Sequence, residues 1–229
     1  MRILALETTG MTGSVALLED ECVANEITLR DDQRSAQSLA PAIQEAVQTA
    51  GWTLDSMNLI AVAVGPGSFT GLRVGITTAK LLAYILKANV LSLDTLEVLA
   101  EQAKDVHPTS RIHGIFDAQR NEVFAATFQR DEVGNLTRIA ETRIVSNAAW
   151  LASLSSGDVV NGPVLAKLQP QLPAGVLVAD SLQWQPRART IGELARRYYL
   201  TGRRDDVWKL AAEYHRASAA EEKAAAKKA

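Results

Sequence analysis

The stretch ILALETTGMTGSVALLEDECVANEITL, residues 3–29, opens the chain with three short runs that are rich in apolar and β-branched residues. Segments 8–13 and 19–21, which carry glycines, threonines and acidic side chains, separate these runs. Apolar runs of this length, bounded by turn residues, are typical of β-strands. The stretch therefore predicts three consecutive strands, at 3–6, 14–18 and 23–29.

The residues that follow change from a strand period to a helical one. Apolar side chains recur on one face over 36–50, which predicts a helix, although Pro41 removes one backbone donor from it. Strands and helices then alternate, with a strand expected at 59–64, a helix at 70–86, a strand at 90–93 and a helix at 95–104. This order predicts a mixed sheet flanked by helices, which is an α/β unit.

The same order recurs in the second half. Three strands are expected at 111–116, 122–128 and 136–144, then a helix at 147–154, short strands at 159–160 and 176–178, and a closing helix at 189–200. A Gly-Pro pair also recurs at the matching place, because Gly65-Pro66 and Gly162-Pro163 each follow a predicted strand. The repeat predicts a duplication with a cleft between the halves, although two α/β units can share an order by chance. We divide the chain into 1–104, 105–188 and a C-terminal helix with a polar tail, 189–229.

Bulk properties narrow the class of protein. The 229 residues carry a net charge of −2, so no overall basic field draws the chain to nucleic acid. Cys22 is the single cysteine, which excludes an internal disulfide. The opening turns acidic at Glu7, unlike a secretory signal, and no uninterrupted apolar run approaches the ~20 residues of a membrane helix. We expect a cytoplasmic protein.

Residues 65–75, GPGSFTGLRVG, lie between a predicted strand and a predicted helix. Glycines allow tight turns there, Ser68 or Thr70 can cap the helix, and free amides at a helix N-terminus attract anions. The segment lacks the Gly-Lys-Ser/Thr ending of a P-loop and the spacing of a dinucleotide fingerprint. A structural turn and a phosphate site both stay open.

The helix after this segment is apolar on most of its sides, so it needs cover on most sides. Gly71, Gly75, Ala79 and Ala83 form a stripe of small residues four apart, and small side chains let another helix approach closely. Either the preceding helix or another protein chain can supply the second cover. We expect a partner interface on these two helices, with Ala36, Leu39, Ile43, Val47, Gly71, Gly75, Ala79 and Ala83.

Residues 65–75 resemble the signature of the TsaB (YeaZ) family. Segments 3–9 and 14–17 are similar to the first hairpin of that family, and DAQRNEVF, residues 117–124, resembles its second-domain motif. Tyr214-His215-Arg216 resembles its closing Tyr-x-Arg motif. The sequence departs from the family pattern at Gln119, Ala212 and Ser35. The signature loop comprises Gly65, Pro66, Gly67, Ser68, Phe69, Thr70, Gly71 and Arg73.

The resemblance implies an actin-like, ribonuclease H-like two-domain fold (the ASKHA group). It implies a protein that pairs with TsaD, the catalytic subunit that transfers threonylcarbamoyl to the adenosine beside the anticodon of tRNA. TsaE, a small ATPase, docks on that pair, and the chain forms a homodimer when alone. We expect no cofactor of its own, ATP and a metal ion supplied through the partner subunits, tRNA contact only through the complex, and no membrane.

Catalytic signals are weak in this sequence. His107, His113 and His215 are the only histidines, and none of their spacings suits a shared helical metal site. No serine lies in a Gly-x-Ser-x-Gly elbow. We therefore expect no catalytic and no metal-ligating residues, hence a non-catalytic subunit. The alternatives are a stand-alone actin-like kinase or ATPase and, less favoured, a glycoprotease-like peptidase. Residues that could hold a metal-nucleotide in a cleft are Glu7, Thr8, Thr9 and Asp117.

Overall fold

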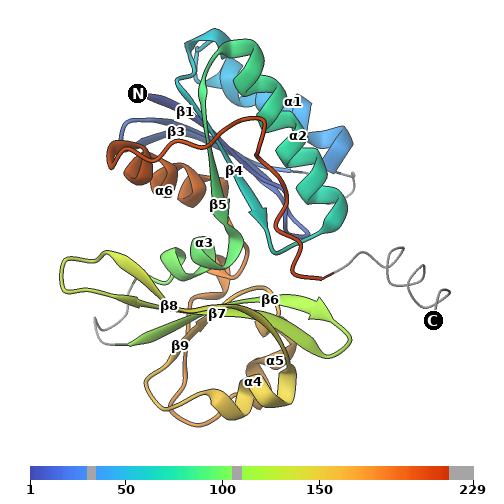
Figure 1. Cartoon of the computed structure of the whole chain (residues 1–229), viewed down its shortest axis with the longest axis vertical. Coiled ribbons are helices and arrows are strands. Elements are labelled where there is room, and N and C mark those ends of the chain that lie inside the picture. Colours follow the sequence, from blue (N-terminus) through green and yellow to red (C-terminus); the bar gives the residue numbers. More distant parts are fainter. Residues whose placement is uncertain (30–34, 105–109, 217–229) are drawn as a thin grey trace, which may run out of the picture.

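The computed structural model describes residues 1–29, 35–104 and 110–216, with the side chains of residues 35 and 36 left out. It forms two α/β halves, one above the other in Figure 1. The first half contains β1 (Arg2–Glu7), β2 (Ser14–Glu19), β3 (Cys22–Thr28), α1 (Ser35–Thr49), β4 (Leu59–Gly65), α2 (Phe69–Leu86) and β5 (Asn89–Asp94). The second contains α3 (Thr95–Gln102), β6 (Arg111–Gln119), β7 (Glu122–Arg130), β8 (Leu136–Ser146), α4 (Asn147–Ser153), β9 (Val159–Asn161), α5 (Leu165–Leu168) and β10 (Leu177–Val178), before α6 (Ala188–Leu200).

Both sheets have one topology, which confirms the predicted duplication. The first sheet has the order β3-β2-β1-β4-β5 and the second the order β8-β7-β6-β9-β10. In each, the first three strands pair antiparallel, and the fourth and fifth join parallel to the first. Two such sheets with flanking helices are the actin-like duplicated fold that the family resemblance implied.

Both faces of the first sheet are buried. On one face, α1 and α2 cover the sheet with Leu39, Ile43, Leu72 and Ile76. On the other, α6 returns from the C-terminal part of the chain and packs against Ile3, Ala5 and Ala61, among others. The helix α6 was predicted as a separate terminal segment, yet its contacts make it part of the first domain.

The second sheet is covered by α3 on one face and by α4 and α5 on the other. The helix α3 thus lies between the sheets in Figure 1, directly after β5 and against β6 and β7. The strands and longer helices agree with the sequence prediction to within a few residues. The sequence did not predict α5, the 3₁₀ turns Leu54–Ser56, Gln169–Gln171 and Ser181–Gln183, or the path of residues 201–216.

One described helix, α2, is long and apolar enough to cross a membrane by length and composition alone. Its residues Gly71, Leu72, Gly75, Ile76, Ala79 and Ala83 are buried in the chain itself. About a third of the helix is thus buried, on the side that faces the first sheet.

Candidate functional site

The end of β1 and the first two residues of the loop that follows it are buried inside the protein. Glu7, Thr8 and Thr9 expose at most 1% of their surface. The Glu7 Oε1 atom accepts hydrogen bonds from the Thr9 amide and hydroxyl, both at 2.5 Å, and from the Gly10 amide at 3.3 Å. Its Oε2 atom has no partner. Burial raises the pKa of Glu7 to about 7, against the lowering effect of these hydrogen bonds.

The signature loop closes over this segment. The Ser68 amide donates to the Thr9 carbonyl at 2.8 Å, and the Thr8 hydroxyl donates to the Gly71 carbonyl at 2.8 Å. A Cβ atom on Gly67 would lie 2.4 Å from the Thr9 Cβ, and one on Gly71 would lie 1.8 Å from the Thr8 carbonyl oxygen. The glycines of this loop therefore let the chain pack against itself.

The remaining signature residues have separate places. Ser68 is the N-cap of α2, as expected, and accepts from the Gly71 amide at 3.3 Å. Pro66 is buried, whereas Phe69, Thr70 and Arg73 reach the surface. The Arg73 guanidinium lies 3.9 Å from the centre of the Phe69 ring.

Asp117 lies apart from the Glu7 loop, two residues before the end of β6. Its side chain is 40% exposed and pairs with Lys167 at 3.2 Å. Its Oδ1 atom accepts from the Gln119 amide at 2.7 Å. Among the contacts of the described residues, none joins Asp117 to Glu7, Thr8 or Thr9. A nucleotide site that brings these four residues together across a cleft stays a prediction.

Residues 201–216, here called the strap, run from the end of α6 back across the first domain to the second (Figure 1). Asp205 bridges to Val90 and accepts from the Ser92 amide at 2.7 Å. Lys80 on α2 donates to the carbonyls of Trp208 and Leu210, at 3.3 and 3.1 Å. The strap then passes the mouth of the cleft between the sheets.

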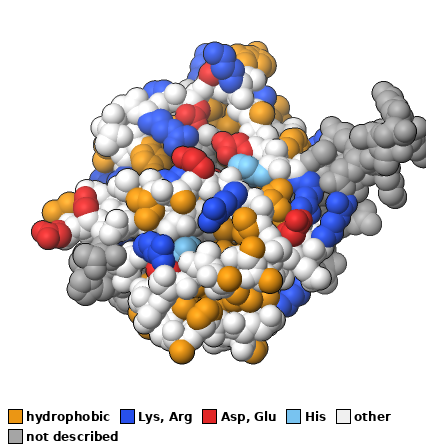
Figure 2. All heavy atoms as spheres, turned by 60° about the horizontal axis from the view of Figure 1, so that its bottom comes forward, with side chains coloured by type: hydrophobic (Ala, Val, Ile, Leu, Met, Phe, Trp, Pro, Cys, Tyr) orange, Lys and Arg blue, Asp and Glu red, His pale blue; other side chains and the backbone are white. Residues whose placement is uncertain are grey.

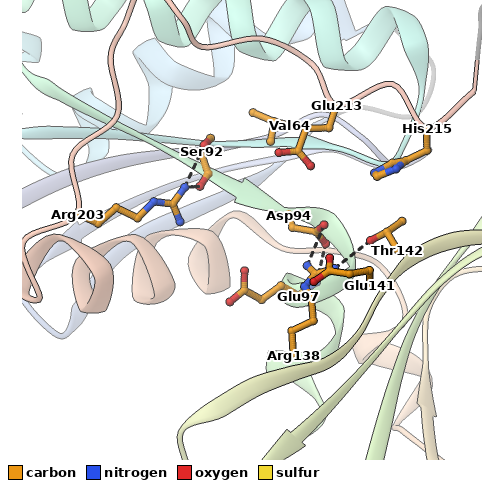
Figure 3. A pocket seen from close by; sticks show the side chains of 10 residues that line it. All are labelled: Val64, Ser92, Asp94, Glu97, Arg138, Glu141, Thr142, Arg203, Glu213 and His215. Carbon is orange, nitrogen blue, oxygen red and sulfur yellow. Dashed lines mark hydrogen bonds and ion pairs between the residues drawn. The ribbon is translucent and has the colours of Figure 1, made fainter.

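A cavity of about 320 Å³ lies under the strap, between the first domain and β8. Figure 3 shows acidic and basic side chains around it, from β5, α3, β8 and the strap. Arg138 of β8 pairs with Asp94 at 3.0 Å and lies 4.8 Å from the Phe128 ring centre. Burial raises the pKa of Glu97, although its hydrogen bond from Tyr198 lowers it. The Arg138–Asp94 contact joins β8 of the second half to the end of β5 in the first half.

Charges of both signs intermingle around the mouth of this cavity (Figure 2). Among the described residues, no three His, Cys, Asp or Glu side chains are grouped so that they could hold a metal ion. Of the three histidines, His107 lies outside the described residues. His113 is buried and lies 3.3 Å from both the Asp158 carboxylate and the Thr127 hydroxyl. His215 lines the cavity at the end of the strap.

The described residues that were predicted to form the partner interface are buried in the chain's own core. Gly71, Gly75, Ala79 and Ala83 are buried, because this stripe of α2 faces the chain's own first sheet. The predicted residues of α1, namely Leu39, Ile43 and Val47, lie in the same core, and the side chain of Ala36 is outside the described residues. None of the described members is on the surface, so the close contact that the stripe predicts is made with Thr8 and β4.

Comparison with known proteins decides the family. A family model described as "TsaD: tRNA N6-adenosine threonylcarbamoyltransferase" matches residues 23–178. The "tRNA threonylcarbamoyladenosine biosynthesis protein TsaB" of Bacillus subtilis is 32% identical over 234 residues, which is 97% of this chain and 97% of that protein. The protein of the same name from Escherichia coli is 37% identical over 134 residues, 58% of either chain.

The chain belongs to the TsaB family.

Solved structures agree with the family in fold. YeaZ from Pseudomonas aeruginosa superposes with a TM-score of 0.79 at 23% identity, over 93% of this chain and 99% of that one. A second structure, described as similar to peptidase YeaZ from the same organism, gives 0.80 at 24% identity, over 94% and 99%. The resemblance that residues 65–75 gave from sequence is thereby confirmed.

The residues missed by sequence reasoning lie on the strap and on the outer face of α2. Large apolar side chains are exposed there in Leu81, Tyr84, Ile85 and Trp208, and the Tyr84 and Trp208 rings are 5.3 Å apart. The α2 sequence carried a signal for this face, because the helix is apolar on more sides than one sheet can cover. Nothing in the sequence places Trp208 beside it.

Proposed function

We propose that this member of the TsaB family is a non-catalytic subunit that pairs with a TsaD-type transferase and supports its action on tRNA. Family membership assigns the chain to threonylcarbamoyladenosine biosynthesis. One observation carries the finer assignment: the chain covers Glu7, Thr8 and Thr9 with its own signature loop. Residues sealed in this way are unable to hold a metal-nucleotide without a rearrangement of the loop.

The outer face of α2 is the surface that we assign to the partner. Tyr84 and Ile85 are 62% and 61% exposed, and Trp208 of the strap, at 71%, extends the face. Exposed apolar patches of this kind mark interaction sites. The transferase family model matches this chain, so the transferase and this chain are expected to share a fold. Like folds can pair through the same helices, as the subunits of a two-fold dimer do.

The proposal extends to the rest of the assembly. The same face would form a homodimer when the chain is alone. The homodimer and the pair with the TsaD-type subunit would then compete for this face. A TsaE-type ATPase would dock on the pair, and ATP and a metal ion would be bound by the partner subunits. The chain would reach tRNA only within the complex, in the cytoplasm.

Pairing is tested with the purified chain and a TsaD-type subunit, by light scattering after gel filtration and by titration. We expect a heterodimer. Tyr84→Glu and Ile85→Glu should weaken it at least tenfold, because each places a charge in an apolar contact. Val133→Glu is the control, since Val133 is exposed on the far turn between β7 and β8. Wild-type affinity in both α2 variants would place the interface elsewhere.

The rival functions are tested in the same preparations. The isolated chain should neither modify tRNA nor hydrolyse ATP or peptides, and addition of the transferase and the ATPase should restore tRNA modification. Turnover by the isolated chain that a single substitution in it abolishes would favour a kinase, an ATPase or a peptidase instead.

A further inference from the structure

Three segments that stand out in the sequence meet at residues 213–216 of the strap. They are the signature loop, the hairpin between β6 and β7, and the closing motif Tyr214-His215-Arg216 itself. Each lies far from the others along the chain, so their contact is a property of the fold.

The strap holds the first domain through Glu213 and Tyr214. The Glu213 amide donates to the Val64 carbonyl at 2.9 Å, at the end of β4. The Tyr214 ring lies 5.2 Å from that of Phe69, and its hydroxyl accepts from Arg73 Nε at 3.2 Å. This end of the strap is therefore fixed to the first turns of α2.

Arg216, two residues after Tyr214, contacts the second domain. Arg216 donates to the Ala118 carbonyl at 2.6 Å and pairs with the Glu122 carboxylate. Ala118 and Glu122 flank the tip of the hairpin, where three successive residues, 119–121, have left-handed φ values of 61°, 54° and 59°. Residues other than glycine rarely adopt this backbone conformation, and it persists where contacts with the surrounding structure hold it. Arg216 is one such constraint, because it bonds to both sides of the tip.

The middle of the strap is fixed to the outer face of α2. Lys80 donates to two strap carbonyls, Tyr84 packs against Trp208, and Leu210 is buried in the first-domain core. Residues 208–216 thus link the exposed face of α2 to the hairpin of the second domain through a continuous series of contacts.

We infer that the strap is a clasp that couples the outer face of α2 to the hairpin between β6 and β7. A change at either end alters the strength with which the other is held, because coupling between two sites is reciprocal. Arg216 makes the contacts of the strap with the hairpin of the second domain. Lys80 lies on α2, and its amine is hydrogen-bonded to two strap carbonyls, so we expect it to act on the hairpin through the strap.

Hydrogen exchange on the full chain tests this coupling. The readout is the exchange rate of the amides of residues 117–123, with the β1 and β4 amides as an internal reference for the fold. We expect Arg216→Ala to speed exchange at the hairpin roughly tenfold, which corresponds to about 1.4 kcal/mol. Lys80→Met keeps an apolar stem of similar length, and it should speed exchange at the same amides although it lies in the other domain.

Arg204→Ala is the matched control. Arg204 belongs to the strap, but its hydrogen bonds are to the Tyr199 and Arg203 carbonyls and its guanidinium stacks on Tyr199, so hairpin exchange should stay at the wild-type rate. If Arg216→Ala disturbs the reference amides as well, Glu122→Gln replaces it and removes the same ion pair from the hairpin side. Unchanged hairpin exchange in the Arg216 or Glu122 variant overturns the clasp. Unchanged exchange in Lys80→Met, beside an effect of Arg216→Ala, overturns the coupling to α2.

Discussion

Glu7 is a fully buried carboxyl that the protein leaves half satisfied. Three donors reach its Oε1 atom, whereas Oε2 has none, and burial dominates the pKa, which rises from 4.5 to about 7. The folded protein therefore keeps the proton up to about pH 7, while the unfolded chain releases it near pH 4.5. Stability from this group is fully present below pH 4.5 and is lost as the pH rises through 7.

Glu7→Gln should therefore stabilise the protein at pH 8. The amide carries no charge to bury, and the difference between 4.5 and about 7 corresponds to at most about 3 kcal/mol. Urea unfolding at pH 5 and pH 8 measures the effect, which should be much smaller at pH 5.

His113 also contributes to the pH dependence of stability. Burial lowers the pKa of His113, so this residue destabilises the folded state as the pH falls below about 6.5. The difference between wild type and Glu7→Gln cancels this contribution. Glu141→Gln, on the exposed edge of the cavity, is the control and should leave the profile unchanged. An equal pH dependence in wild type and Glu7→Gln would show that Glu7 ionises normally in the folded state.

At the scale of the element, the sequence of α2 predicted its length and its cap but not its orientation. Its length, its cap at Ser68 and its need for cover on two sides followed from the sequence. The direction of its small-residue stripe did not, because a helix apolar on most sides has no polar face to mark the solvent. The structure turns the stripe toward Thr8 and leaves Leu81, Tyr84 and Ile85 outside.

Substitutions on α2 should follow that orientation. Ala79 is completely buried, so Ala79→Trp should overpack the core and lower stability by at least ~1–3 kcal/mol. Leu81→Trp, two residues along on the exposed side, is the control and should leave the melting temperature nearly unchanged. Thermal unfolding of both variants decides the point. A stable Ala79→Trp beside a destabilised Leu81→Trp would mean that the helix is turned the other way.

The strands were the most predictable elements. Leu59–Gly65 is buried along its whole length and reads as an unbroken apolar run, and the hairpins alternate between apolar runs and turn residues. The site was less predictable, because it depends on contacts between distant segments. Glu7 ends β1 and Asp117 lies near the end of the equivalent strand β6, yet the signature loop covers Glu7 whereas Asp117 is partly exposed and pairs with Lys167. The sequence of residues 201–216 has no period, so nothing in it predicted the path of the strap.

At the scale of the whole molecule, the first domain is built from both ends of the described chain. Ile191 of α6 is fully buried against the first sheet, whose first strand begins at Arg2. Ile191→Ala should cost about 2–5 kcal/mol and should loosen the β1 amides in hydrogen exchange, although it lies in a segment remote in sequence. Leu200→Ala, at the exposed end of the same helix, is the control. Equal effects of the two variants would contradict the placement of α6.

The position of α6 also bears on synthesis at the ribosome. Strands β1 to β5 emerge first, but one face of their sheet is covered only by Val98 of α3 until α6 emerges, after the second sheet is complete. The second sheet and its helices, from α3 to β10, are contiguous in the chain, and the later residues that pack against their cores, Ala179 and Trp184, follow directly. Domains generally fold as units during translation, in the order in which their parts become available. The half that is translated second can therefore close first, and the nascent first half carries a partly exposed apolar sheet face until α6 arrives.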